Sequence, residues 1–269
     1  MRLAVCAGIA AVCPGPVPAG AAPAAELPER FDTVVIDAGH GGDDQGARGP
    51  RGLLEKDIVL DVARRLAAKL REARVRVVLT RDGDRFVGLE ERTSIANDAR
   101  ADLFVSIHAN GSDARAARGI ETFFVSLDAS DDAARALAEA ENQAFVRPGE
   151  ATPAAADPLL AILGDLIATE HVMESQEFAR LAQRRLATAE TARSRGVKQA
   201  PFVVLMGVQM PAVLVEIGFL TNAAEERVLR DETERERLVR ELAGAVESFR
   251  ERVDARRGVA AGGGTGGGG

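Results

Sequence analysis

Tryptophan and tyrosine are absent from this 269-residue chain, and histidine and cysteine are scarce, with 3 and 2 residues respectively. Without Trp or Tyr, the aromatic platforms on which sugars and bases often stack are limited to phenylalanine. Basic residues do not dominate either, because the net charge is -7 and the isoelectric point is about 5.2. This charge disfavours nucleic acid and anionic membrane surfaces as partners, since both would repel the chain on average.

Long apolar runs are missing after the first stretch, so we expect no membrane span in the mature chain. Residues 1–25 carry one early arginine, then an apolar run, then small residues, which is the pattern of a secretory signal peptide. Both cysteines, Cys6 and Cys13, lie in this segment, so its removal would leave no disulfide. We therefore expect a periplasmic or secreted protein. At the other end, residues 258–269 are rich in glycine and are predicted to form a disordered tail.

Strand-like and helix-like segments alternate through the first half of the chain, which is the pattern of a mostly parallel sheet with helices on its faces. Predicted strands cover residues 34–36, 75–80, 101–110, 119–126 and 212–220, and predicted helices cover 53–74, 88–100, 131–146, 177–193 and 234–253. A further apolar run, 201–206, precedes the last strand. We therefore predict an α/β fold with one catalytic domain over residues 31–254.

Residues 127–177 interrupt this alternation. They contain a predicted helix, a Pro- and Ala-rich loop and the start of a second helix at 159–167, with no pattern of a core strand. Long insertions in compact domains are usually lids or binding loops. We therefore expect a helical insertion that lies over the sheet.

The segment Thr33–Gly49, TVVIDAGHGGDDQGARG, changes from a β-branched run to glycines and acids around His40. Its glycines allow a sharp turn where the strand ends, and open α/β sheets bind ligands beyond the carboxyl ends of their strands. The segment is also similar to a phosphate-binding loop. That interpretation fails, because the third glycine of the dinucleotide spacing and a Lys-Ser/Thr ending are missing and two acids stand where phosphates would lie.

His108 follows another apolar run in the same way, and Glu55 lies in the first turn of the helix predicted at 53–74. Two imidazoles and one carboxylate form a set that Zn²⁺ accepts, with a fourth position open for catalysis. Each residue also has an ordinary explanation, since single histidines are usually packed or at the surface and acids favour first helical turns. The position of both His40 and His108 at strand ends favours the zinc site.

Glu216 lies within an apolar strand, and a buried strand does not hold a carboxylate without a reason. An ion pair with an arginine at the edge of the core is one explanation. Because the strand ends in Gly218 and shares the predicted sheet with both histidines, a catalytic base that faces the metal is the better interpretation.

Five blocks of this sequence resemble the zinc-dependent N-acetylmuramoyl-L-alanine amidases of bacterial cell-wall turnover. They are IDAGHGGDDQGARG, LLEKDIVLDVARRLAAKL, LTRDGDRFVGLEERTSIANDARADLFVSIHAN, GIETFF and PAVLVEIGFLTNAAEE, in the family's order. The resemblance implies a mostly parallel sheet of about six strands. It also implies three zinc ligands and one catalytic carboxylate, which are His40, Glu55 and His108 for the metal and Glu216 for catalysis. The implied substrate is peptidoglycan, cut at the amide between N-acetylmuramic acid and the L-alanine of the stem peptide.

The insertion resembles that of the cell-division amidases of diderm bacteria, in which a regulatory helix blocks the zinc site until an activator protein moves it. This resemblance implies a blocking acid at Glu141 and an activator of the degenerate endopeptidase-like type. The implied docking surface for that activator is Leu159, Leu160, Leu163 and Leu166. An amphipathic helix that packs on the core in the usual way would explain the same pattern.

Two other functions remain open for the same residues. A zinc exopeptidase would use a related fold and a His/Glu/His site, but it would release free terminal amino acids rather than intact stem peptides. A wall-binding module without catalysis would release nothing, and the presence of all three predicted ligands together with Glu216 argues against it.

Overall fold

The computed structural model describes residues 30–144, 169–188 and 193–259. The predicted signal peptide, most of the predicted tail and the predicted docking residues Leu159, Leu160, Leu163 and Leu166 lie outside these ranges. The strands are β1 (Thr33–Ala38), β2 (Arg76–Leu79), β3 (Leu103–Asn110), β4 (Ile120–Val125), β5 (Ser194–Ala200) and β6 (Ala212–Phe219). The helices are α1 (Glu55–Glu72), α2 (Leu89–Asp98), α3 (Asp132–Ala144), α5 (Thr169–Leu186), α6 (Val203–Met206), α7 (Ala223–Arg230) and α8 (Glu232–Arg256). Within these ranges, no helix is both long and apolar enough to cross a membrane.

The six strands form one sheet in the order β2-β1-β3-β6-β4-β5. Neighbouring strands are parallel except for β4 and β6, which run antiparallel. The predicted α/β fold with a mostly parallel sheet is therefore confirmed. Because of the single reversal, the carboxyl ends of β1, β3 and β6 and the amino ends of β4 and β5 lie at the same end of the strands. This end is called the sheet edge below.

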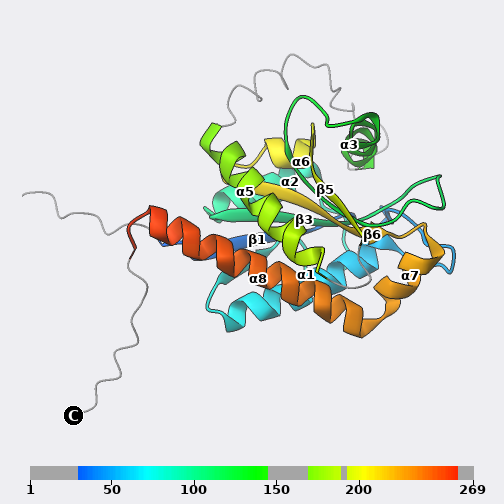
Figure 1. The fold of residues 1–269 in the computed structure, drawn as a ribbon, viewed down its shortest axis with the longest axis horizontal. Coiled ribbons are helices and arrows are strands. Elements are labelled where there is room, and N and C mark those ends of the chain that lie inside the picture. Colours follow the sequence, from blue (N-terminus) through cyan, green and yellow to red (C-terminus); the bar gives the residue numbers. More distant parts are fainter. Residues whose placement is uncertain (1–29, 145–168, 189–192, 260–269) are drawn as a thin grey trace, which may run out of the picture.

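Side chains alternate along the strands between two apolar layers. One layer lies between the sheet and helices α1, α5 and α8, and its rings of Phe178 and Phe249 are 5.3 Å apart. Figure 1 shows α5 and α8 crossing this face of the sheet, with α3 set apart from them. The other layer holds α2, α3 and α6, and there the rings of Phe123 and Phe202 are 5.1 Å apart. The domain is thus a three-layer sandwich with helices on both faces.

The region before β6 differs from the sequence-based expectation. Residues Ser194–Ala200 form an edge strand, although their sequence, SRGVKQA, predicts none. Only Ala200 of this strand is fully buried. The sequence of the strand therefore lacks the alternation of apolar and polar residues by which a strand is predicted. The apolar run 201–206 forms the short helix α6, whose Val204 and Leu205 pack into the second layer.

The structure describes two pieces of the predicted insertion 127–177. Residues 127–144 include α3, which packs against β5 and α6. Residues 169–177 are the first half of α5, which packs against α8 and β4. The helix predicted at 159–167 lies outside the described residues. In the described part of the insertion, α3 lies on the second face, and Val172 near the start of α5 also packs against that layer.

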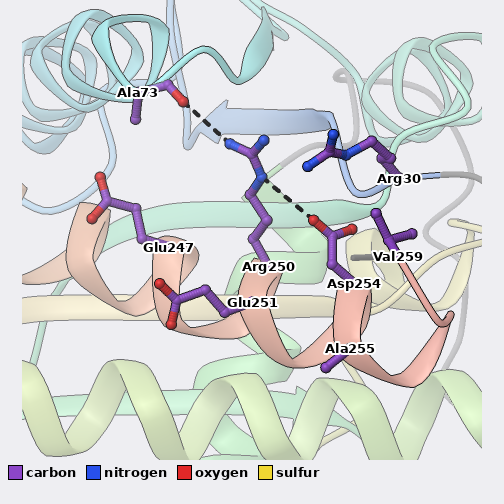
Figure 2. Close-up of a pocket in the computed structure, with 8 residues that line it drawn as sticks. All are labelled: Arg30, Ala73, Glu247, Arg250, Glu251, Asp254, Ala255 and Val259. Carbon is purple, nitrogen blue, oxygen red and sulfur yellow. Dashed lines mark hydrogen bonds and ion pairs between the residues drawn. The ribbon is translucent and has the colours of Figure 1, made fainter. Parts of the chain in front are cut away.

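A surface pocket lies where the end of α1 meets α8, far along α1 from Glu55 (Figure 2). Arg250 donates a hydrogen bond of 3.2 Å to the carbonyl of Ala73, the residue that ends α1, and lies 3.9 Å from Asp254. Lysine and arginine side chains often satisfy the last carbonyls of a helix in this way. The pocket is lined by Arg30, Ala73, Glu247, Arg250, Glu251, Asp254, Ala255 and Val259. It contains none of the predicted site residues, and its polar groups close a helix end.

A buried ion pair joins β1 to α2 on the second face. Arg92 Nη1 lies 2.5 Å from Asp37 Oδ1, and both side chains are fully buried. Thr80 and Ser106 donate hydrogen bonds of 2.6 and 2.7 Å to the same carboxylate. Burial alone would raise the pKa of Asp37, but the charge of Arg92 and these hydrogen bonds hold the pKa below its usual value of 3.8. The ionised carboxylate is therefore the form that the folded state favours.

Replacing Asp37 with Asn should lower the free energy of unfolding by about 3–5 kcal/mol at pH 7, because Arg92 is left buried without its counter-charge. Since the pKa of Asp37 is lowered by folding, this stability is present above the ordinary pKa and is lost as the pH falls through the folded-state pKa. The difference in free energy of unfolding between the wild type and the variant, measured by urea unfolding, should therefore become smaller below about pH 4.

The matched control is Asp82→Asn, which removes an exposed partner of Arg64 and should change stability little. A similar loss from both variants, or a gap that persists unchanged to pH 3, would contradict the assigned role of the buried pair.

Candidate active site

The loop after β1 approaches the other site residues too closely for side chains at two of its positions. A Cβ atom at position 39 would collide with the ring of His108. At position 46, a Cβ atom would collide with both the Glu55 carboxylate and the His40 ring. Glycine at these two positions therefore lets the loop bring His40 against Glu55 and His108, which explains part of the glycine-rich pattern.

His40 itself adopts a left-handed backbone conformation, with φ of 58°. This region is unfavourable for a residue with a side chain, so the surroundings must stabilise it. Two buried arginines do so by donating hydrogen bonds to three consecutive loop carbonyls. Arg81 donates to Ala38 and Gly39 at 2.9 and 2.8 Å, and Arg92 donates to Ala38 and His40 at 2.7 and 2.9 Å. The loop that carries His40 is thus fixed through its backbone.

Four side chains bring potential metal ligands together at the sheet edge, within 4.8 Å of one another: His40, Glu55, His108 and Glu141. His40 Nε2 lies 3.0 Å from Glu55 Oε1 and 3.5 Å from Glu141 Oε2. His108 Nδ1 lies 3.2 Å from each of the same two oxygens. Donor atoms about 2.0–2.1 Å from a tetrahedral Zn²⁺ would be roughly 3.3–3.4 Å apart, so these distances fit a tetrahedral ion. The three predicted ligands therefore lie together, and the predicted blocking acid lies with them.

Hydrogen bonds from the loop orient these groups. Asp44 Oδ2 lies 2.8 Å from His40 Nδ1, so the opposite ring nitrogen, Nε2, points to the cluster. The backbone N–H groups of Ala47 and Ala109 donate to the two oxygens of Glu55, at 2.8 and 2.9 Å. Such outer contacts set the orientation of metal ligands in proteins. Sequence analysis assigned no role to Asp44, although an acid four residues after a candidate ligand is a usable signal.

The carboxylates around the two imidazoles favour positive charge there. Burial would lower the pKa of His40, but Glu55, Asp44 and Glu141 raise it to about 10. Glu141 and Glu55 likewise raise the pKa of His108 against the effect of burial. A divalent cation would meet the same demand for positive charge, so the electrostatics agree with the donor geometry.

Glu216 of β6 lies directly opposite His108 of β3 in the parallel register, so both side chains project from the same face. It is fully buried, and neither of its carboxylate oxygens has a hydrogen-bond partner among the described residues. Burial raises the pKa of Glu216 well above its usual range, and Glu55 and Glu141 add to the rise while His108 opposes it. A carboxyl group with a raised pKa can exchange protons near neutral pH.

Comparisons with known proteins agree with this geometry. Residues 34–248 match the family model described as N-acetylmuramoyl-L-alanine amidase. The chain is 37% identical over 217 residues to the N-acetylmuramoyl-L-alanine amidase AmiA of Escherichia coli K12, which covers 80% of this chain and 75% of that protein. It is 34% identical over 221 residues to the amidase AmiC of Neisseria meningitidis, covering 82% of this chain but about half, 53%, of that protein.

A solved structure has the same fold. The N-acetylmuramoyl-L-alanine amidase AmiC2 of Nostoc punctiforme superposes with a TM-score of 0.63 at 29% identity, covering 82% of this chain and 98% of that one. Since the family model spans most of the chain and the relatives align across the whole domain, the chain belongs to the N-acetylmuramoyl-L-alanine amidase family.

Proposed function

We propose that the chain is a zinc-dependent peptidoglycan amidase that hydrolyses the amide between N-acetylmuramic acid and the L-alanine of the stem peptide. One observation carries the proposal: donor atoms at tetrahedral spacing lie beside a buried carboxyl group in a chain of the amidase family. With the signal peptide expected at 1–25, the catalytic domain at 31–254 acts in the periplasm or outside the cell. Its role is wall remodelling and the separation of daughter cells.

In this proposal, His40, Glu55 and His108 would hold Zn²⁺, which would supply Lewis-acid chemistry toward the scissile carbonyl and the attacking water. Glu216 accepts the proton of the attacking water and passes it to the departing nitrogen of L-alanine. Its raised pKa supports this role, because the carboxyl group must keep the proton between the two steps. Asp44 keeps the ring of His40 in the orientation that the reaction needs.

We further propose that α3 holds the enzyme in a resting state. Glu141 Oε2 lies against both imidazoles, at 3.5 Å from His40 Nε2 and 3.2 Å from His108 Nδ1. A catalytic zinc site needs this fourth position for water or substrate. While the Glu141 carboxylate fills it, neither can bind, so hydrolysis requires the helix to move.

The way α3 is seated supports its displacement by a partner protein. Its fully buried apolar residues are Ala134 and Ala138, whose methyl groups bury little apolar area, and Leu137 packs against the second layer while half-buried. Asn142 makes two hydrogen bonds to the segment after β5, donating to Pro201 O and accepting from Val203 N, each at 2.9 Å. The activator of the endopeptidase-like type would exchange these polar contacts for its own.

Replacing Glu216 with Gln should leave zinc binding intact and lower amide hydrolysis by at least about 10²-fold, since the group that moves the proton is lost. Replacing His108 with Ala should remove the zinc itself. Metal analysis of the purified chains measures the zinc that each variant retains, and mass analysis of peptidoglycan fragments with and without a chelator measures amide hydrolysis.

Intact stem peptides and peptide-free glycan are the expected products, whereas free terminal amino acids would indicate an exopeptidase and no products a wall-binding module. Glu90→Gln, an exposed acid at the start of α2, is the control and should behave like the wild type. Loss of zinc from Glu216→Gln, or retained activity, would refute the assigned role.

Replacing Glu141 with Ala should raise the basal rate about tenfold or more without any partner, which corresponds to removing at least about 1.4 kcal/mol of bias toward the covered state. Glu139→Ala is the matched control, because Glu139 is exposed on the same helix and should leave the rate unchanged. Dye release from labelled peptidoglycan measures both variants. Equal rates for Glu141→Ala and the wild type would show that α3 does not restrain the enzyme.

A further inference from the structure

Two cations of β5 lie against Glu121 of β4, the strand next to the one that carries the candidate base. His108, Glu216 and Glu121 stand in register on β3, β6 and β4, and neighbouring strands are about 4.8 Å apart. Lys198 Nζ lies 2.9 Å from Glu121 Oε2, and Arg195 Nε lies 3.0 Å from the same oxygen. The row of site residues therefore continues into a pair of positive charges supplied by β5.

The blocking helix supplies the second carboxylate of this cluster. Asp131, at the start of α3, places Oδ2 at 3.1 Å from Lys198 Nζ, while its Oδ1 accepts a hydrogen bond from Ala134 N. Lys198 and Arg195 share Glu121, so Asp131 provides the carboxylate that balances the second cation. Lys198 is only 12% exposed, and a mostly buried cation is costly to leave without a counter-charge.

The same helix thus brings one carboxylate to the metal ligands and another to Lys198. Asp131 and Glu141 are ten residues apart, about 15 Å along a helix axis. An extended peptide covers this distance with about four to five residues. A short acidic peptide could therefore place an amide at His40 and His108 and a carboxylate at Lys198.

The surroundings of Arg195 hold its charged group at this place. The guanidinium carbon lies 4.9 Å from the ring centroid of Phe219, at the end of β6, so the cation rests on an aromatic face. Asn110 donates a hydrogen bond of 3.0 Å to the other oxygen of Glu121, which fixes that carboxylate between the cations and the end of β3. Arg195 and Glu121 are therefore held by contacts outside α3, and Lys198 keeps its ion pair with Glu121 when Asp131 is removed.

We propose that Lys198 and Arg195 form a carboxylate-binding subsite for the peptide of the substrate, and that Asp131 occupies this subsite while α3 is seated. The inference rests on the proposed amidase function and deepens it. Once α3 moves, Lys198 loses a counter-charge, and an acidic group of the stem peptide replaces it. While it is seated, the helix thus occupies both places, with Glu141 at the candidate metal ligands and Asp131 at Lys198.

The test compares two soluble muramyl-peptide substrates, one with free peptide carboxylates and one with those carboxylates converted to methylamides. With the full wild-type chain, the methylamide substrate should have a KM about tenfold higher at similar kcat, which is the loss of about 1.4 kcal/mol of binding. Lys198→Met should raise the KM of the acidic substrate about tenfold and leave that of the methylamide unchanged. Lys198→Arg should restore the preference, because it restores the charge.

Equal losses on both substrates would overturn the proposal, since they would mean that Lys198 only supports the fold through Glu121. Asp131→Asn keeps Lys198 in place and serves as the second variant. Because Asp131→Asn removes the competing carboxylate, it should lower the KM of the acidic substrate several-fold and leave the KM of the methylamide substrate unchanged. Equal KM changes for both substrates would also overturn the proposal. Absence of turnover of either substrate by both the wild-type chain and Glu141→Ala would instead refute the amidase function itself.

Discussion

The position of His40 depends on buried arginines that hold the backbone of its loop. Arg81 and Arg92 donate to the carbonyls of residues 38–40, and Arg92 is in turn fixed by the fully buried carboxylate of Asp37. Backbone carbonyls in a left-handed turn have no partners in a sheet or helix, so they need donors from elsewhere. The guanidinium fork supplies several donors at fixed angles. The left-handed turn at His40 is therefore supported by one charged network behind the candidate site.

The register of the sheet places three polar side chains of the candidate site in one row across neighbouring strands. His108, Glu216 and Glu121 are opposite one another on three adjacent strands, so their side chains share one face and one edge. Just beyond this row the pairing of β3 with β6 shifts, and Gly218 has a φ of 148°. Bulges of this kind re-aim a strand next to active sites. The reversal of β4 brings the amino end of β5 to the same edge, and the side chain of Lys198, from the middle of β5, reaches Glu121 there.

The sequence alone predicted the elements whose signals are local. The apolar runs before His40 and His108 predicted the strands, and the first-turn position of Glu55 followed from the helix periodicity. The strand β5 was missed because an edge strand needs no continuous apolar pattern. Asp37 and Arg92 were missed because a contact between residues 55 positions apart leaves no periodic trace. Glu141 was identified only through resemblance to a family, since the pattern of an amphipathic helix predicts that an acidic residue is exposed to solvent.

Helix α3 is packed on the domain differently from the other long helices, α5 and α8. α5 and α8 insert Phe178, Leu186 and Phe249 into the first layer, so their removal would expose large apolar areas. Among its described residues, α3 buries Ala134 and Ala138, packs the half-buried Leu137 against the second layer, and makes polar contacts through Asn142, Asp131 and Glu141. Polar contacts can be exchanged one for one with water, a partner or a peptide, at a much smaller net cost than buried apolar surface. The proposed displacement of α3 would therefore cost less free energy than removal of α5 or α8 from the first layer.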